Sequence, residues 1–115
     1  MTSYCRGEVL LLPFPFTDLS STKRRPAVVL STDAYNARHL DVIVAPVTSN
    51  ASGRQPHDCA ISEWSAAGLA KPSLVKGIIG TVEQSRIIRR LGSLTAADMR
   101  AVERAIAPAI GLVAP

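Results

Sequence analysis

Short runs of β-branched and aliphatic residues, broken by proline, glycine or polar turn formers, recur along the chain up to about residue 91. Such runs predict strands, because valine and isoleucine fit a pleated, largely buried surface. We expect strands over residues 8–14, 27–31, 41–47, 57–61, 74–82 and 87–91. Gly77 and Gly80 lie inside the fifth of these runs, which predicts a bend of the kind that closes a small barrel.

The last part of the chain predicts one amphipathic helix. Thr95 stands three residues before Asp98, as in a capping box with Asp in place of the usual Glu or Gln. Apolar residues then recur at helical spacing over 99–106, and Pro108 should weaken the last turn. A turn or a short helical piece is expected at 32–36, and one helical turn from Ser62 to Ala67, before Gly68. The pattern is therefore mainly β with a C-terminal α-helix.

Composition limits the possible functions. A chain of 115 residues with 47% hydrophobic and 19% charged residues is expected to form one globular domain over residues 1–115. Its net charge of +4 and pI near 9.6 favour a polyanionic partner. Only 4% of the residues are aromatic, so a base-stacking surface would rest on few rings.

The cysteines and histidines predict no metal site or cofactor. Cys5 and Cys59 lie far apart and form no metal-ligand spacing with His39 or His57. We expect both cysteines to be free thiols in a reducing compartment, which places the protein in the cytoplasm. The apolar run 9–12 is too short for a membrane span and is soon interrupted by proline, so no membrane association is expected.

A basic triplet precedes the second predicted strand. Lys23, Arg24 and Arg25 run into a proline and then into apolar residues that belong in a core. If the second and third strands pair antiparallel, Arg25 lies beside Thr48. A guanidinium matches the oxygens of a phosphate, and a neighbouring hydroxyl can donate a further hydrogen bond. The pair could therefore hold a phosphodiester, whereas the plain alternative is a solvated basic loop.

Further residues near these two are candidates for substrate binding. They are Lys23, Arg24, Ser49, Asn50, Arg54, Phe16 and His57. For the cations, phosphate contacts and plain solvation are equally good interpretations. A rival hypothesis makes His39 and His57 a base and acid pair, and a weaker one makes Cys59 a nucleophile.

The sequence Arg-Pro-Ala-Val-Val-Leu at 25–30, Pro-Val-Thr-Ser at 46–49 and Gly7 before the first strand resemble the MazF/PemK toxin family. The resemblance implies an SH3-like barrel similar to that of CcdB, a homodimer, and metal-independent cleavage of single-stranded RNA. It also implies an antitoxin that blocks the site through an acidic, partly disordered segment. The catalytic arginine and threonine of the family fall on Arg25 and Thr48.

The chain departs from the family pattern in two places. The loop ahead of Arg25 has no glycine, with Ser20 at its middle, and Gly77 and Ile78 stand where many members carry Asp-Gln. Base selectivity and rate depend on such positions. Two other functions share the expected fold: a CcdB-like toxin that binds gyrase without catalysis, and a catalytically silent SH3-like binding module.

Overall fold

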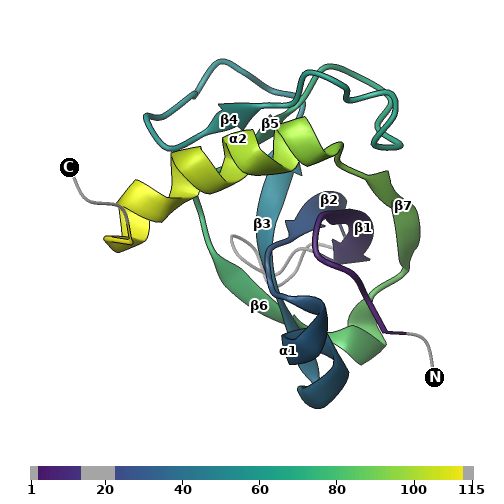
Figure 1. Ribbon diagram of the computed structural model, residues 1–115. Coiled ribbons are helices and arrows are strands. Elements are labelled where there is room, and N and C mark those ends of the chain that lie inside the picture. The colour runs from purple at the N-terminus through teal and green to yellow at the C-terminus, as the bar shows by residue number, and fades with distance from the viewer. Residues whose placement is uncertain (1–2, 14–22, 113–115) are drawn as a thin grey trace.

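The computed structural model describes residues 3–13 and 23–112, so Phe14, Phe16 and Ser20 lie outside the described residues. The strands are β1 (Glu8–Pro13), β2 (Arg24–Val29), β3 (Asp41–Thr48), β4 (Cys59–Ala60), β5 (Leu74–Val75), β6 (Gly80–Glu83) and β7 (Arg89–Ser93). The helices are α1 (Asp33–Arg38), α2 (Ala96–Ile106) and the 3-10 helices η1 (Gln84–Arg86) and η2 (Ala107–Ile110). A mainly β chain with a C-terminal helix is thus confirmed (Figure 1).

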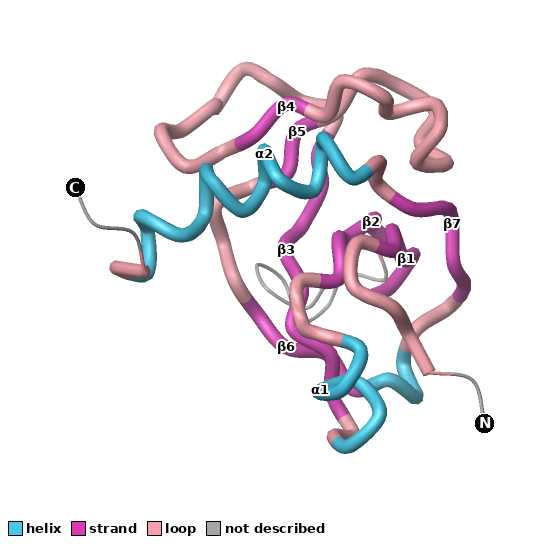
Figure 2. Tube along the Cα trace, viewed as in Figure 1, coloured by secondary structure: helices cyan, strands magenta, loops and turns pink. Residues whose placement is uncertain are grey.

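The strands form one curved antiparallel sheet in the order β4-β5-β3-β2-β1-β7, with β6 also paired to β3. The second and third predicted strands pair antiparallel as expected, with Ala27 opposite Pro46 and Val29 opposite Val44. The strand β3 pairs with β6 along its first half and with β5 at its end. In Figure 2 the helix α2 crosses one side of the curved sheet.

Two apolar clusters lie on opposite faces of the sheet, because side chains alternate along each strand. Val9 and Val28 pack in the cluster that includes α2, whereas Leu10 and Leu12 pack in the second cluster. All four side chains are buried. The first strand is therefore covered on both faces, as its sequence predicts.

The C-terminal helix begins as predicted. The hydroxyl of Thr95 accepts a hydrogen bond from the Asp98 N–H, at 3.1 Å. The Asp98 carboxylate accepts hydrogen bonds from the backbone N–H groups of Ser62 and Glu63, at 3.1 and 2.9 Å. Asp98 therefore links the first turn of α2 to the turns that begin at Ser62. No described helix is long and apolar enough to cross a membrane.

Several predicted elements differ in extent. Residues 62–68 form turns that include the predicted single helical turn, because the Ala67 N–H donates to the Glu63 carbonyl oxygen at 3.1 Å, and Gly68 ends this turn with φ +83°. The strand β7 continues through Gly92, where it was expected to end. A Cβ at Gly92 would lie 2.5 Å from the carbonyl oxygen of Ala67, so this glycine permits the close approach of the turns to β7.

The long strand predicted over 74–82 was wrong in the middle. It is divided into β5 and β6, and residues 76–79 between them belong to neither strand. Between the Lys76–Pro46 contact and the Val44–Gly80 pair, residues 77–79 stand opposite the single residue Ala45, so the ladder with β3 is interrupted, and the Gly77 N–H bonds to the Asp58 carboxylate. The fourth strand is also shorter than predicted and begins at Cys59, because the Asp58 N–H bonds to the Gln55 carbonyl oxygen in a turn, at 3.0 Å.

Candidate functional site

Arg25 and Thr48 lie at the same end of two paired strands and on the same face of the sheet. Arg25 is two residues before Ala27, and Thr48 is two residues after Pro46, which is the partner of Ala27. Because alternate residues share a face, both side chains project on the side of the Ala27–Pro46 pair. Arg25 is exposed and Thr48 is half-buried. The predicted antiparallel pairing of the two strands is confirmed, and by this register Arg25 and Thr48 lie at the same end of them.

The Thr48 hydroxyl has a defined orientation. Its Oγ1 accepts a hydrogen bond from the Asn50 N–H at 3.1 Å. The Asn50 side-chain oxygen in turn accepts bonds from the N–H and the hydroxyl of Ser52, at 3.0 and 2.7 Å. Since Oγ1 acts as an acceptor in this turn, the hydroxyl hydrogen remains available for donation to a ligand oxygen.

The strand β2 presents its arginines on opposite faces. Arg25 pairs with Leu12 of β1, whose side chain is fully buried, and Arg24 pairs with Pro13. Consecutive residues of a strand point to opposite faces, so the two guanidinium groups do not act together on one atom. No described carboxylate forms an ion pair with Arg25. Its exposed guanidinium is therefore accessible to an anion.

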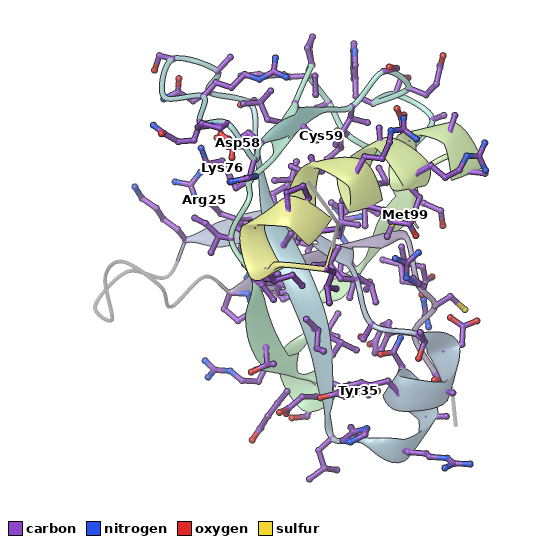
Figure 3. All side chains as sticks on the ribbon, turned by 60° about the vertical axis from the view of Figure 1, so that its left-hand side comes forward. Arg25, Tyr35, Asp58, Cys59, Lys76 and Met99 are labelled. Atoms are coloured by element: carbon purple, nitrogen blue, oxygen red, sulfur yellow. The ribbon has the colours of Figure 1, made fainter. Side chains whose placement is uncertain are left out.

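The loop of residues 49–58 is anchored by one buried carboxylate. Asp58 accepts hydrogen bonds from the Gln55 N–H at 2.7 Å and the Gly77 N–H at 2.8 Å, and Lys76 Nζ lies 2.5 Å from Oδ2. Burial raises the pKa of Asp58, but the hydrogen bonds and the charge of Lys76 outweigh it, so this pKa lies below its ordinary value. Figure 3 shows Asp58, Lys76 and Arg25 along the same side of the molecule.

Sequence reasoning missed Asp58 and Lys76. They are 18 residues apart, and nothing in the sequence marks either as the partner of the other. Only the pairing of β4 with β5, where Cys59 is opposite Val75, indicates that Asp58 and Lys76 are partners. One residue further along this register, Asp58 is opposite Lys76.

Four of the other predicted substrate-binding residues lie in the same loop: Ser49, Asn50, Arg54 and His57. Ser49, Asn50 and Arg54 are exposed on it, and Lys23 is exposed just before β2. His57 is half-buried, and its Nδ1 lies 3.1 Å from the carbonyl oxygen of Ala105 in α2.

The structure does not bring the two histidines together. The His39 ring stacks on Tyr35, with centroids 3.8 Å apart, before β3 begins, whereas His57 follows the loop after β3 ends. Both cysteines are free thiols, as predicted. Burial, with a smaller effect of the Asp98 charge, raises the pKa of Cys59, which disfavours a thiolate nucleophile. No group of metal-binding side chains gathers within residues 3–13 and 23–112.

Together these features define a small antiparallel β-barrel protein with an exposed arginine and a half-buried threonine, Arg25 and Thr48, at one end of its sheet. The family described as PemK-like, MazF-like toxins of type II toxin–antitoxin systems matches residues 5–110. This match spans most of the chain, so the protein belongs to that family, as the motifs at Arg25 and Thr48 indicate.

Solved structures show the same fold. An endoribonuclease in complex with its cognate antitoxin, from a mycobacterial species, aligns with a TM-score of 0.80 and 22% identity over 98% of this chain and 100% of that chain. MazF from Deinococcus radiodurans aligns with a TM-score of 0.77 and 26% identity, over 96% and 99% of the two chains. The Mycobacterium tuberculosis toxin MazF-mt6 aligns with a TM-score of 0.76 and 23% identity, over 93% of this chain and 99% of that chain. The predicted barrel of the CcdB/MazF/PemK type is confirmed.

Proposed function

We propose that this protein is the toxin of a type II toxin–antitoxin system and acts as a metal-independent endoribonuclease on single-stranded RNA, with mRNA as its target. The observation that carries the proposal is the position of Arg25 and Thr48, on one face and at one end of β2 and β3. A strand-held guanidinium beside an oriented hydroxyl suits the recognition of one phosphodiester.

The reaction follows from the chemistry of the two groups. The 2′-hydroxyl of the RNA attacks the adjacent phosphorus, the bond to the 5′-oxygen breaks, and a cyclic phosphate and a 5′-hydroxyl result. Negative charge grows on the phosphate oxygens in the transition state. Arg25 stabilises this charge, and the Thr48 hydroxyl donates a hydrogen bond that strengthens as the charge develops. Arg25 has no acceptor for a proton, so it is not the general base.

The remaining candidate residues complete the proposed binding surface for RNA. Lys23, Arg24 and Arg54 contact backbone phosphates, whereas Ser49, Asn50, Phe16 and His57 contact the nucleotides flanking the cut. The opposite faces of Arg24 and Arg25 imply that Arg24 binds a phosphate other than the scissile one.

The expected partners follow the family. An acidic, partly disordered antitoxin segment binds the same basic surface and competes with RNA, and the charge of +4 attracts both. Antitoxin complexes are known for the structurally similar mycobacterial endoribonuclease. We further propose that the protein is a cytoplasmic homodimer.

The test is incubation of the protein with a long single-stranded RNA in the presence of EDTA. We expect fragments that end in a cyclic phosphate, and their loss in Arg25→Ala. The matched control is Arg38→Ala, which removes the same charge from the exposed end of α1. Intact RNA with the wild type would overturn the proposal. Inhibition of gyrase by the same preparation would then favour the CcdB-like alternative.

A further inference from the structure

Lys76 follows β5 directly and lies on the same face of the sheet as Thr48. The strands β3 and β5 pair with Val47 opposite Val75 and Thr48 opposite Leu74. The next pair in this register is Pro46 with Lys76, and the Lys76 N–H donates to the Pro46 carbonyl oxygen at 2.8 Å. Side chains alternate, so Lys76 shares a face with Leu74 and hence with Thr48.

The distances implied by this register are short. Thr48 has Leu74 as its direct partner on β5, and Lys76 is two residues further along, a diagonal neighbour whose Cα lies about 7 to 8 Å from that of Thr48. A lysine side chain spans much of that distance. Arg25, on the other neighbouring strand, projects from the same face. Thus Arg25 and Lys76 come from the two strands that flank the end of β3, one on each side of Thr48.

The ammonium group of Lys76 is held in place but is not enclosed. Asp58, whose side chain is only 2% exposed, accepts its hydrogen bond, and the Lys76 side chain is 21% exposed. The Gly53 carbonyl oxygen lies 3.5 Å from Nζ. An ammonium has three donors, so these two acceptors leave one donor for a further partner.

We propose that Lys76 is a further substrate-binding residue, whose ammonium contacts a backbone phosphate of the RNA next to Thr48, and that Asp58 is its positioning residue. This inference rests on the proposed function. A purely structural ion pair would not contact RNA, whereas this proposal requires the third N–H of the Lys76 ammonium to bind a phosphate of the RNA. The buried carboxylate orders the lysine before binding, which lowers the entropic cost of the contact.

The decisive variant is the double substitution Lys76→Met/Asp58→Asn. Lys76→Met alone leaves a buried carboxylate without its counter-charge. The double variant removes both charges and loses only one of the two backbone N–H bonds to position 58, so its melting temperature is measured before its kinetics. Lys76→Arg retains the cation. Lys71→Met is the matched control, because Lys71 is exposed in the loop before β5 and its removal lowers the charge by the same amount.

The measurement is the cleavage of a short single-stranded RNA with a mapped cut site, at salt concentrations from about 50 to about 200 mM. For the double variant we expect KM to rise about tenfold at low salt, as for the loss of one charge-assisted hydrogen bond, with kcat within about twofold of the wild type. The slope of log(kcat/KM) against log[salt] should be shallower by about 0.7, the value for one phosphate contact on a single strand. Lys76→Arg should have a KM close to that of the wild type, and Lys71→Met should keep the salt slope of the wild type.

Two outcomes separate this inference from the proposed function. A folded double variant with wild-type KM and salt slope overturns the role of Lys76, even if Arg25→Ala is inactive. A wild type that does not cut RNA overturns the proposed function and the role of Lys76 with it. A double variant in which kcat alone falls also contradicts a binding contact and indicates that the ion pair only shapes the loop.

Discussion

The substitution Asp58→Asn should be strongly destabilising although the side chain keeps its size. Asp58 accepts three hydrogen bonds, from Lys76 Nζ and from the backbone N–H groups of Gln55 and Gly77. An amide offers one oxygen in place of two and turns a donor toward the remaining N–H groups. It also leaves the ammonium of Lys76 without its counter-charge.

The magnitude follows from the burial of the pair. Removal of one partner of a buried ion pair costs about 3 to 5 kcal/mol. Asp58 is almost fully buried, but a fifth of the Lys76 side chain is exposed, so water can solvate the ammonium in part. We therefore expect a loss of about 3 kcal/mol in the free energy of unfolding, from the lower end of that range. In a domain of this size the melting temperature falls by about 10 °C.

Urea unfolding at neutral pH measures this loss, with Glu63→Gln as the matched control because Glu63 is an exposed carboxylate. The pH dependence gives a second measurement. The folded pKa of Asp58 lies below its ordinary value of 3.8, so its stabilising effect is complete above that pH and is lost as the pH falls through the folded pKa. The difference between wild type and Asp58→Asn should therefore be constant near neutral pH and shrink below about pH 4. A loss no greater than that of Glu63→Gln would refute this reasoning.

Two further predictions concern a turn and the site. Gly68→Ala places a Cβ 2.0 Å from the Leu91 carbonyl oxygen, at a residue whose φ is +83°. We expect it to lower the free energy of unfolding by more than about 2 kcal/mol in thermal unfolding. The control Gly53→Ala, which has open space around the Cβ position, should change that free energy by no more than about 0.5 kcal/mol. A mild effect of Gly68→Ala would show that the turns do not pack against β7 in solution. Thr48→Val should lower kcat for RNA cleavage on the order of a hundredfold, with only a small fall in melting temperature from the lost hydrogen bond to the Asn50 N–H. An unchanged kcat would exclude the hydroxyl from the transition state.

The parts of the fold that are readable from the sequence are those governed by local rules. The boundaries of β1 and β3 follow from β-branched runs between turn formers, and the start of α2 follows from the Thr95 cap. The neighbourhood of Arg25 and Thr48 follows from the simplest pairing of consecutive strands. Each of these predictions needs only a short segment or one connection.

The parts that escaped prediction depend on distant contacts. The break between β5 and β6 arises because Gly77 approaches His57 and bonds to Asp58, and a Cβ at Gly77 would lie 2.6 Å from that of His57. The Lys76–Asp58 pair depends on the register of strands that are only two residues long. Such short strands carry too little pattern to fix their partners from the sequence.

The most direct test of the central claim is the use of an RNA with a single 2′-deoxy substitution on the nucleotide before the mapped cut. The attacking group of the proposed reaction is then missing, while the scissile phosphate and its contacts with Arg25 and Thr48 remain. We predict that this RNA still competes with the unmodified substrate but is not cut at that position. Cleavage of the deoxy-substituted bond by the wild-type protein would contradict the account.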